Sequence, residues 1–170
     1  GKGYNHPRIW AQYANNHRGV CIVFDLVKLY EELLRHNSEK NVLQGKVTYS
    51  EKYLDLFNEG EDPYKVDVKM VEKIGIEKYY YKHLKENKRV YYFNKHSDWK
   101  DENEYRIVIL DDNSNDVYVR MEEIAIAVIV GSEFPDAYKP SLITLCKELK
   151  IDAFKIVWNQ GFAKDLSLIY

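Results

Sequence analysis

Two glutamates and an arginine alternate in the stretch Trp99-Lys100-Asp101-Glu102-Asn103-Glu104-Tyr105-Arg106, directly before an apolar segment. Because residues two apart in an extended chain project to the same face, we expect Glu102, Glu104 and Arg106 to line one side. A carboxylate at a strand edge can accept a ribose hydroxyl, stabilise an oxocarbenium-like centre or act as a general base. The same side chains could equally form an ion pair on a solvated sheet face. Glu104 and Glu102 are therefore candidate catalytic residues, with the second interpretation still open.

A second group of side chains, Trp10, Tyr13 and His17, is spaced to share one face of a short helix. An aromatic wall with a titratable tip can stack a nicotinamide or adenine ring. The spacing is equally typical of a helix that packs by its aromatic face, with His17 near the helix end, where a partly charged imidazole suits the dipole. These three residues, together with Arg106, are candidate cofactor-binding residues, and a packing role stays open.

Lys95 and His96 stand just before the acidic turn and could contact a phosphate from a loop. A solvated loop is the other interpretation, unless the fold brings them toward Glu104. Metal chemistry has little support, because the acidic residues at 98–104 have no His or Cys at ligand spacing. A metal-dependent nuclease would also need a distant carboxylate and a strand lysine, and neither is identified. We therefore expect no metal.

The composition indicates one globular domain over residues 1–170, with 45% apolar and 31% charged residues. The net charge of −2 gives no strong nucleic-acid signal, although a local basic patch such as residues 82–89 remains open. Fifteen tyrosines are many for this length, and they cluster at residues 79–81 and 91–92. Such rings form half-buried walls or stack a base.

Two cysteines, Cys21 and Cys146, each lie in an apolar run and make no metal spacing. They indicate reduced core thiols in a cytosolic protein. The sequence has no stretch of membrane-span length and no signal peptide. We therefore expect a cytoplasmic location and no membrane partner.

Strands and helices mix in the chain without regular strand–helix alternation, so α+β is the expected class. We expect a mainly antiparallel sheet with a long helix and two or three shorter helices packed on it. Apolar and alternating runs predict strands at 20–24 (buried on both faces), 42–49, 104–110, 124–130, 154–158 and 166–170. The strand at 104–110 is expected to form a hairpin with residues 117–119. Helical spacing predicts helices at 8–17, after Asp25, at 63–88 with a kink at Gly75, and at 140–150.

Three stretches together resemble a bacterial family known as domain of unknown function number 2971. The first is Trp10-Ala11-Gln12-Tyr13-Ala14 with His17-Arg18-Gly19-Val20-Cys21-Ile22-Val23-Phe24-Asp25. The second is Lys95 followed by Trp99, Glu102, Glu104 and Arg106, and the third is Ile126-Ala127-Val128-Ile129-Val130-Gly131. Their order and spacing match the family over nearly the whole chain. The family has a further strand–helix segment upstream, which this chain is expected to lack.

The resemblance implies an effector of the toxin or phage-defence kind, with a weaker similarity to ADP-ribosyltransferases of the Glu-x-Glu class. Carried over by residue, Glu104 would hold the nicotinamide ribose of NAD and Glu102 would orient the acceptor. Trp10 and Tyr13 would belong to the pocket wall. The acceptor would be an unknown macromolecule. The alternative is a non-catalytic nucleotide- or protein-binding regulatory domain.

Overall fold

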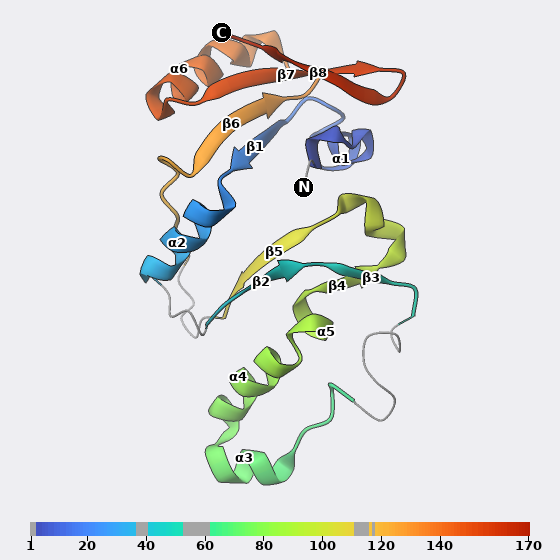
Figure 1. Cartoon of the computed structure of the whole chain (residues 1–170), viewed down its shortest axis with the longest axis vertical. Helices are drawn as coiled ribbons and strands as arrows, with labels where there is room; N and C mark the ends of the chain where they lie inside the picture. Colours follow the sequence, from blue (N-terminus) through green and yellow to red (C-terminus); the bar gives the residue numbers. More distant parts are fainter. Residues whose placement is uncertain (1–2, 37–40, 53–61, 111–115, 117) are drawn as a thin grey trace. The chain divides into compact units, whose positions relative to one another are not determined.

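The chain divides into two compact units in the structure, which is a computed structural model describing residues 3–36, 41–52, 62–110, 116 and 118–170 (Figure 1). Unit 1 covers Asn37–Ser114, and unit 2 covers Lys2–His36 and Asn115–Tyr170. Each unit is described by itself below. The expectation of a single domain over residues 1–170 stays a prediction.

Unit 2 is built on a four-stranded sheet. Its strand order is β1 (Val20–Phe24), β6 (Ala125–Val130), β7 (Asp152–Asn159) and β8 (Phe162–Leu168). The β1–β6 and β7–β8 pairs are antiparallel, whereas β6 and β7 are parallel. Parallel neighbours need a crossover connection, and α6 (Lys139–Leu149) supplies it. The sequence predicted a strand, a helix and a strand at 124–130, 140–150 and 154–158, but it did not predict that the two strands pair in parallel.

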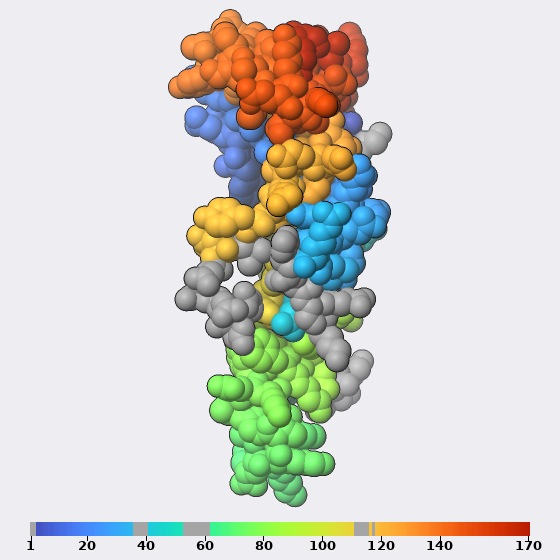
Figure 2. Space-filling view, turned by 90° about the vertical axis from the view of Figure 1, so that its left-hand side faces the viewer, coloured from blue at the N-terminus to red at the C-terminus, as the bar shows by residue number. Residues whose placement is uncertain are grey.

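Helices cover both faces of this sheet because its central strands are apolar on both sides. Val128 and Val130 of β6 pack with Cys146 of α6 in one core cluster. Ile129, which points to the other face, packs with Trp10 of α1 (Pro7–Tyr13) in a second cluster. Figure 2 shows α6, β7 and β8 packed together in orange to red. The sheet thus buries alternate residues of the same strand against different helices.

The β1 strand matches its predicted bounds, but the prediction that both of its faces are buried is wrong. β1 has one strand partner, β6, and every second residue along it is exposed. After β1, Asp25 Oδ1 accepts hydrogen bonds from the amides of Val27 (3.0 Å) and Lys28 (3.2 Å). This confirms Asp25 as the cap of α2 (Leu26–His36). Two short 3₁₀ turns, η1 (Gly3–Asn5) and η5 (Asp136–Tyr138), complete the unit.

The described residues of unit 1 form two strand pairs. β2 (Val42–Lys46) pairs antiparallel with β5 (Tyr105–Ile109), and β3 (Thr48–Ser50) pairs parallel with β4 (Asn94–His96). The predicted strand at 42–49 is therefore two strands, separated at Val47. A core of buried Leu43, Leu84, Phe93 and Leu110 joins the β2–β5 pair to the helices.

Among the described residues of unit 1, two helices replace the one long helix predicted for residues 63–88, and a third begins where that helix was expected to end. They are α3 (Val68–Ile74), α4 (Ile76–Glu86) and α5 (Lys88–Tyr92). The predicted start at Pro63 is wrong, because Asp67 caps the helix by accepting the amide of Met70 (3.0 Å). Asp62 instead accepts the amide of Tyr64 in a turn (2.9 Å). Gly75 separates α3 from α4 with a positive φ of 84°, a conformation that glycine adopts readily.

The α+β class is confirmed, and most strand pairs are antiparallel. The predicted hairpin of 104–110 with 117–119 is wrong where it can be compared, because β5 pairs with β2 and Tyr118 and Val119 are not in a strand. Residues 111–115 and 117 lie outside the described residues. None of the helices within the described ranges has the length and apolarity to cross a membrane.

Candidate functional site

Four charged side chains of unit 1 form one connected cluster, which we call the ionic cluster: Lys95, Glu102, Glu104 and Arg106. Arg106 holds Glu104 at two points, with Nε donating to Oε2 at 2.7 Å and Nη2 donating to Oε1 at 3.1 Å. Lys95 Nζ donates to Glu104 Oε1 at 2.9 Å and also to Glu102 Oε2. Of the three residues predicted to line one side of an extended chain, Glu104 and Arg106 do lie together, but the prediction is wrong for Glu102, which ends a 3₁₀ helix and joins the cluster through Lys95.

Local backbone geometry brings these four residues together. Glu102 ends the 3₁₀ helix η4 (Ser97–Glu102), and Asn103 then turns the chain with a left-handed φ of 46°. Asparagine tolerates this conformation better than most residues. The turn places Glu104 beside β3, where its amide donates to the Tyr49 hydroxyl (2.9 Å). Glu102 and Glu104 therefore reach the same lysine, which extends from β4.

The surrounding cations keep Glu104 ionised. Hydrogen bonds from Arg106 first, and from Lys95, lower the pKa of the Glu104 carboxyl from 4.5 to about 2. The same contacts raise the pKa of Arg106, through Glu104, and of Lys95, chiefly through Glu102. A carboxylate with so low a pKa accepts hydrogen bonds well but is a weak general base near neutral pH.

Lys95 and His96 have different surroundings, and a phosphate contact by either one stays a prediction. Lys95 is turned toward Glu104, and its ammonium lies 4.7 Å from the centre of the Trp99 ring. His96 pairs instead with Asp98, at 3.2 Å between Nδ1 and Oδ2, on the exposed side of η4. Across the described ranges, no group of three or more His, Cys, Asp or Glu side chains is arranged to hold a metal ion. The expectation of no metal stays a prediction.

Trp10, Tyr13 and His17 lie in unit 2 and have different environments. Trp10 is 1% exposed, and its Nε1 donates to the Tyr4 carbonyl at 2.7 Å. Tyr13 is 63% exposed. The His17 ring meets Trp158 edge-on, with 5.8 Å between ring centres. Trp10 therefore acts as a core residue, whereas Tyr13 is the more exposed of the two aromatic residues of α1 in this group.

His17 also supports the fold through its backbone. Asn15, Asn16 and His17 all have positive φ, so the chain reverses after α1 and the His17 amide returns to the Trp10 carbonyl (3.1 Å). The His17 carbonyl then accepts the amide of Glu133 (3.0 Å). A Cβ on Gly131 would lie 1.9 Å from this carbonyl oxygen. Only glycine permits the approach.

The two groups of predicted site residues therefore fall in different units. Glu102, Glu104 and Arg106 belong to unit 1, whereas Trp10, Tyr13 and His17 belong to unit 2. Their assembly into one NAD site stays a prediction, as do their catalytic and cofactor-binding roles.

An aromatic pocket in unit 1 was not assigned from the sequence. Its cavity of about 470 Å³ lies beside α4 and α5, and residues from these helices and from the segment before α3 line it: Tyr64, Val66, Ile76, Tyr79, Tyr80, His83, Leu84, Tyr91 and Tyr92. Tyr79 and Leu84 are buried, whereas Tyr64 and Tyr80 are more than half exposed. The pocket thus has a buried floor and a tyrosine rim. The clustering of tyrosines at 79–81 and 91–92 was its signal in the sequence.

Hydrogen bonds fix the walls of this pocket. The Pro63 carbonyl accepts from the Tyr91 hydroxyl (2.7 Å) and from His83 Nε2 (2.6 Å). A carbonyl oxygen only accepts, so His83 carries its proton on Nε2. The Tyr79 hydroxyl accepts the amide of Asp67 (2.8 Å), and its ring stacks on His83 with 5.4 Å between centres. The ring positions are therefore set before any ligand binds.

Comparison with known proteins gives one family. The family model described as "Protein of unknown function (DUF2971)" matches residues 9–107, from α1 to β5. The match includes the Trp10 and Glu104 blocks, but the third resembling stretch, at 126–131, lies beyond it. Comparisons with curated proteins and with solved structures gave no match, so the similarity to ADP-ribosyltransferases has no support from them. The chain, matched over more than half its length, belongs to the family of proteins of unknown function DUF2971.

Proposed function

We propose that the chain is a nucleotide-binding module whose aromatic pocket in unit 1 receives the planar ring of the ligand. The observation that carries the proposal is the pocket itself: a cavity of about 470 Å³ with six aromatic side chains in its lining. Pockets for small ligands are commonly of this size and mostly apolar. Base–aromatic stacking contributes roughly 1–3 kcal/mol per base.

The chemistry of the lining favours an uncharged aromatic ring. None of the described residues that line the pocket is Asp, Glu, Lys or Arg. The Tyr80 and Tyr92 hydroxyls are among the polar groups of the lining, and a ring nitrogen or an exocyclic amine of a ligand can pair with them. Tyr64 and Tyr80, which are more than half exposed, line the same cavity as the buried Tyr79 and Leu84. An adenine or nicotinamide ring meets these requirements better than an aliphatic side chain does.

The properties of the ionic cluster favour a ligand-binding function of the chain over catalysis by Glu104. Glu104 is held by Arg106 and Lys95 with its pKa near 2, so it lacks the basicity that proton abstraction near neutral pH requires. Each of the four charges has an opposite charge within hydrogen-bond distance. Such a neutralised group stabilises the β3–β5 region without needing a substrate.

Titration of the chain with NAD and with ATP, followed by tyrosine fluorescence, tests the proposal. We expect saturable binding that Tyr80→Ala weakens about tenfold or more, as loss of one stacking face should. Tyr118→Ala is the matched control, because Tyr118 is 83% exposed and lies in unit 2. Equal binding by the Tyr80→Ala variant and the wild type would contradict the proposal.

NAD-dependent ADP-ribosyl transfer is the second candidate, and one observation favours it. Glu104 is ionised at neutral pH, and within the described part of the chain its Oε2 accepts one hydrogen bond, from Arg106 Nε, so it retains capacity to accept a ribose hydroxyl. Incubation with labelled NAD, comparing wild type with Glu104→Gln, tests this function. Transfer of label that the substitution leaves unchanged would exclude Glu104 as the catalytic residue.

A further inference from the structure

One face of α4 carries a row of lysines that the proposed function does not use. Lys78, Lys82 and Lys85 follow the spacing i, i+4 and i+7, so their side chains are attached on the same side of the helix. With 3.6 residues per turn, this side lies roughly opposite Tyr80 and His83, which line the aromatic pocket. The helix therefore separates two sites of different chemistry.

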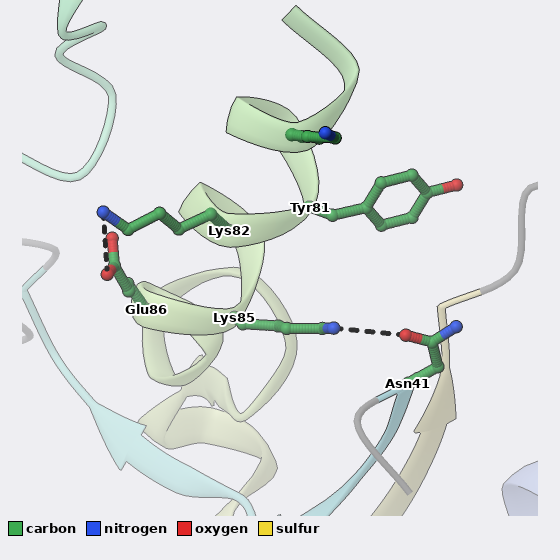
Figure 3. Close-up of a pocket in the computed structure, with 6 residues that line it drawn as sticks. Asn41, Tyr81, Lys82, Lys85 and Glu86 are labelled. Carbon is green, nitrogen blue, oxygen red and sulfur yellow. Dashed lines mark hydrogen bonds and ion pairs between the residues drawn. The ribbon is translucent and has the colours of Figure 1, made fainter. Parts of the chain in front are cut away.

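The three lysines line a cavity of about 600 Å³ together with Asn41, Tyr81 and Glu86 (Figure 3). Lys85 extends toward the start of β2, where its Nζ donates to Asn41 Oδ1 at 3.1 Å. Lys82 points the other way with Glu86. The cavity is thus lined by Lys85, which is held by the Asn41 amide, and by Lys82, which is paired with the Glu86 carboxylate.

The charges in this cavity favour an anionic ligand. Three lysines against one glutamate leave a surplus of two positive charges. The Lys82–Glu86 pair is exposed and its atoms are 3.6 Å apart, so it is weak and an incoming anion can compete for the ammonium. Lys85 uses one N–H on Asn41 and keeps others for a ligand, and the Asn41 amide adds its own NH₂. Donors predominate, so the matching ligand is rich in acceptor oxygens.

The length of the row indicates more than one anionic group. Seven residues of helix separate Lys78 from Lys85, a rise of roughly 10 Å. One phosphate cannot span this distance, whereas charges follow each other every ~3.4 Å along a nucleic-acid strand. We propose that the lysine face, defined as Lys78, Lys82, Lys85 and Asn41, binds a run of linked phosphates. The inference is independent of the proposed function.

Fluorescence anisotropy of a labelled oligothymidylate at several salt concentrations tests this inference on the whole chain. The variant Lys78→Gln/Lys82→Gln/Lys85→Gln is expected to bind about tenfold or more weakly, and the slope of log K against log salt should fall by about two. The control Lys69→Gln/Lys73→Gln/Lys88→Gln removes the same charge from α3 and α5, outside the cavity, and should retain most of the affinity.

Competition with inorganic tripolyphosphate distinguishes the sources of the phosphates. Displacement of the oligonucleotide at similar phosphate concentration supports recognition of phosphate chains in general, and failure to displace it supports a nucleic-acid backbone. Equal losses in the two triple variants, with unchanged melting temperatures, would overturn the proposal, as would no binding at low salt. Tyr80→Ala should leave this binding unchanged, so the two sites can fail separately.

Discussion

Residues from the three stretches that carry the family resemblance are held by different interactions in the two units. In unit 2, Trp10 is buried in a core cluster and a Cβ on Gly131 would meet the His17 carbonyl, so close contact is the main constraint. In unit 1, Lys95, Glu102, Glu104 and Arg106 form a group joined by charge. A packed group tolerates little change of volume, whereas an ionic group tolerates changes of size but responds to pH. Residues of one family resemblance can therefore serve different purposes, packing in unit 2 and charge pairing in unit 1.

Gly131→Ala should have the largest effect, because its Cβ would overlap the His17 carbonyl oxygen at 1.9 Å. The backbone must shift to relieve this contact, and we expect unit 2 to lose about 3 kcal/mol of unfolding free energy. Urea unfolding followed by tryptophan fluorescence measures the loss. A Trp99→Phe background restricts the signal to Trp10 and Trp158, which both lie in unit 2.

Gly3→Ala is the matched control for this prediction, because a Cβ at Gly3 meets nothing within 4 Å. We expect a change within about 0.5 kcal/mol there. If Gly131→Ala unfolds at the same urea concentration as the wild type, the close approach of His17 does not constrain unit 2.

Glu104→Gln should have a smaller effect, confined to unit 1. The amide removes one negative charge from between Arg106 and Lys95, and we expect a loss of about 1–2 kcal/mol, moderated by the partial exposure of these side chains. Hydrogen exchange of the β5 amides measures the local change, and β7 amides in unit 2 serve as an internal control. Equal acceleration in both strands would show that the effect is not local.

Acid should weaken the ionic cluster selectively. Because the folded pKa of Glu104 is about 2 and the ordinary value is 4.5, its stabilisation is complete above about pH 4.5 and is lost as the pH falls toward 2. The protection of β5 amides should therefore fall more steeply in the wild type than in Glu104→Gln over this window. Parallel pH profiles for the two proteins would contradict the assigned pKa.

Arg106→Lys should have the smallest effect. Lysine keeps the charge but loses the two-point contact with Glu104 and the donation from Nη1 to the Tyr92 carbonyl (2.9 Å). We expect about 0.5–1 kcal/mol less stability in unit 1, measured by the same β5 exchange. A loss as large as that of Glu104→Gln would mean that geometry, rather than charge, dominates the ionic cluster.

Local rules predicted the parts of the fold that depend on neighbouring residues. The apolar run of β1 gave its bounds, Asp25 was identified as the cap of α2, and the alternation of Glu104 and Arg106 placed them on one face. Features set by distant contacts were missed. Two acidic residues, Asp62 and Asp67, both fit a helix start, and the hydrogen bond from the Met70 amide selects the second.

The ionic cluster and the aromatic pocket, like the fold, could be predicted only in part from the sequence. The sequence indicated the acidic residues, but Lys95 reaches them only because β4 lies beside β3, and this parallel pairing joins segments more than forty residues apart. Tyr64, Tyr80 and Tyr91 of the aromatic pocket come from three segments. The tyrosine clusters in the sequence therefore indicated several of its lining residues but not its shape. Contacts between distant segments decide where Lys95 lies and what shape the aromatic pocket has. The periodicity of one segment carries no information about such contacts.

The most direct test of the account measures NAD binding and NAD consumption on the same samples of wild type and Glu104→Gln. The account predicts saturable binding with similar affinity in both proteins and no consumption of NAD in either. Consumption by the wild type that the Glu104→Gln variant has lost would contradict it, and would establish Glu104 as catalytic rather than structural.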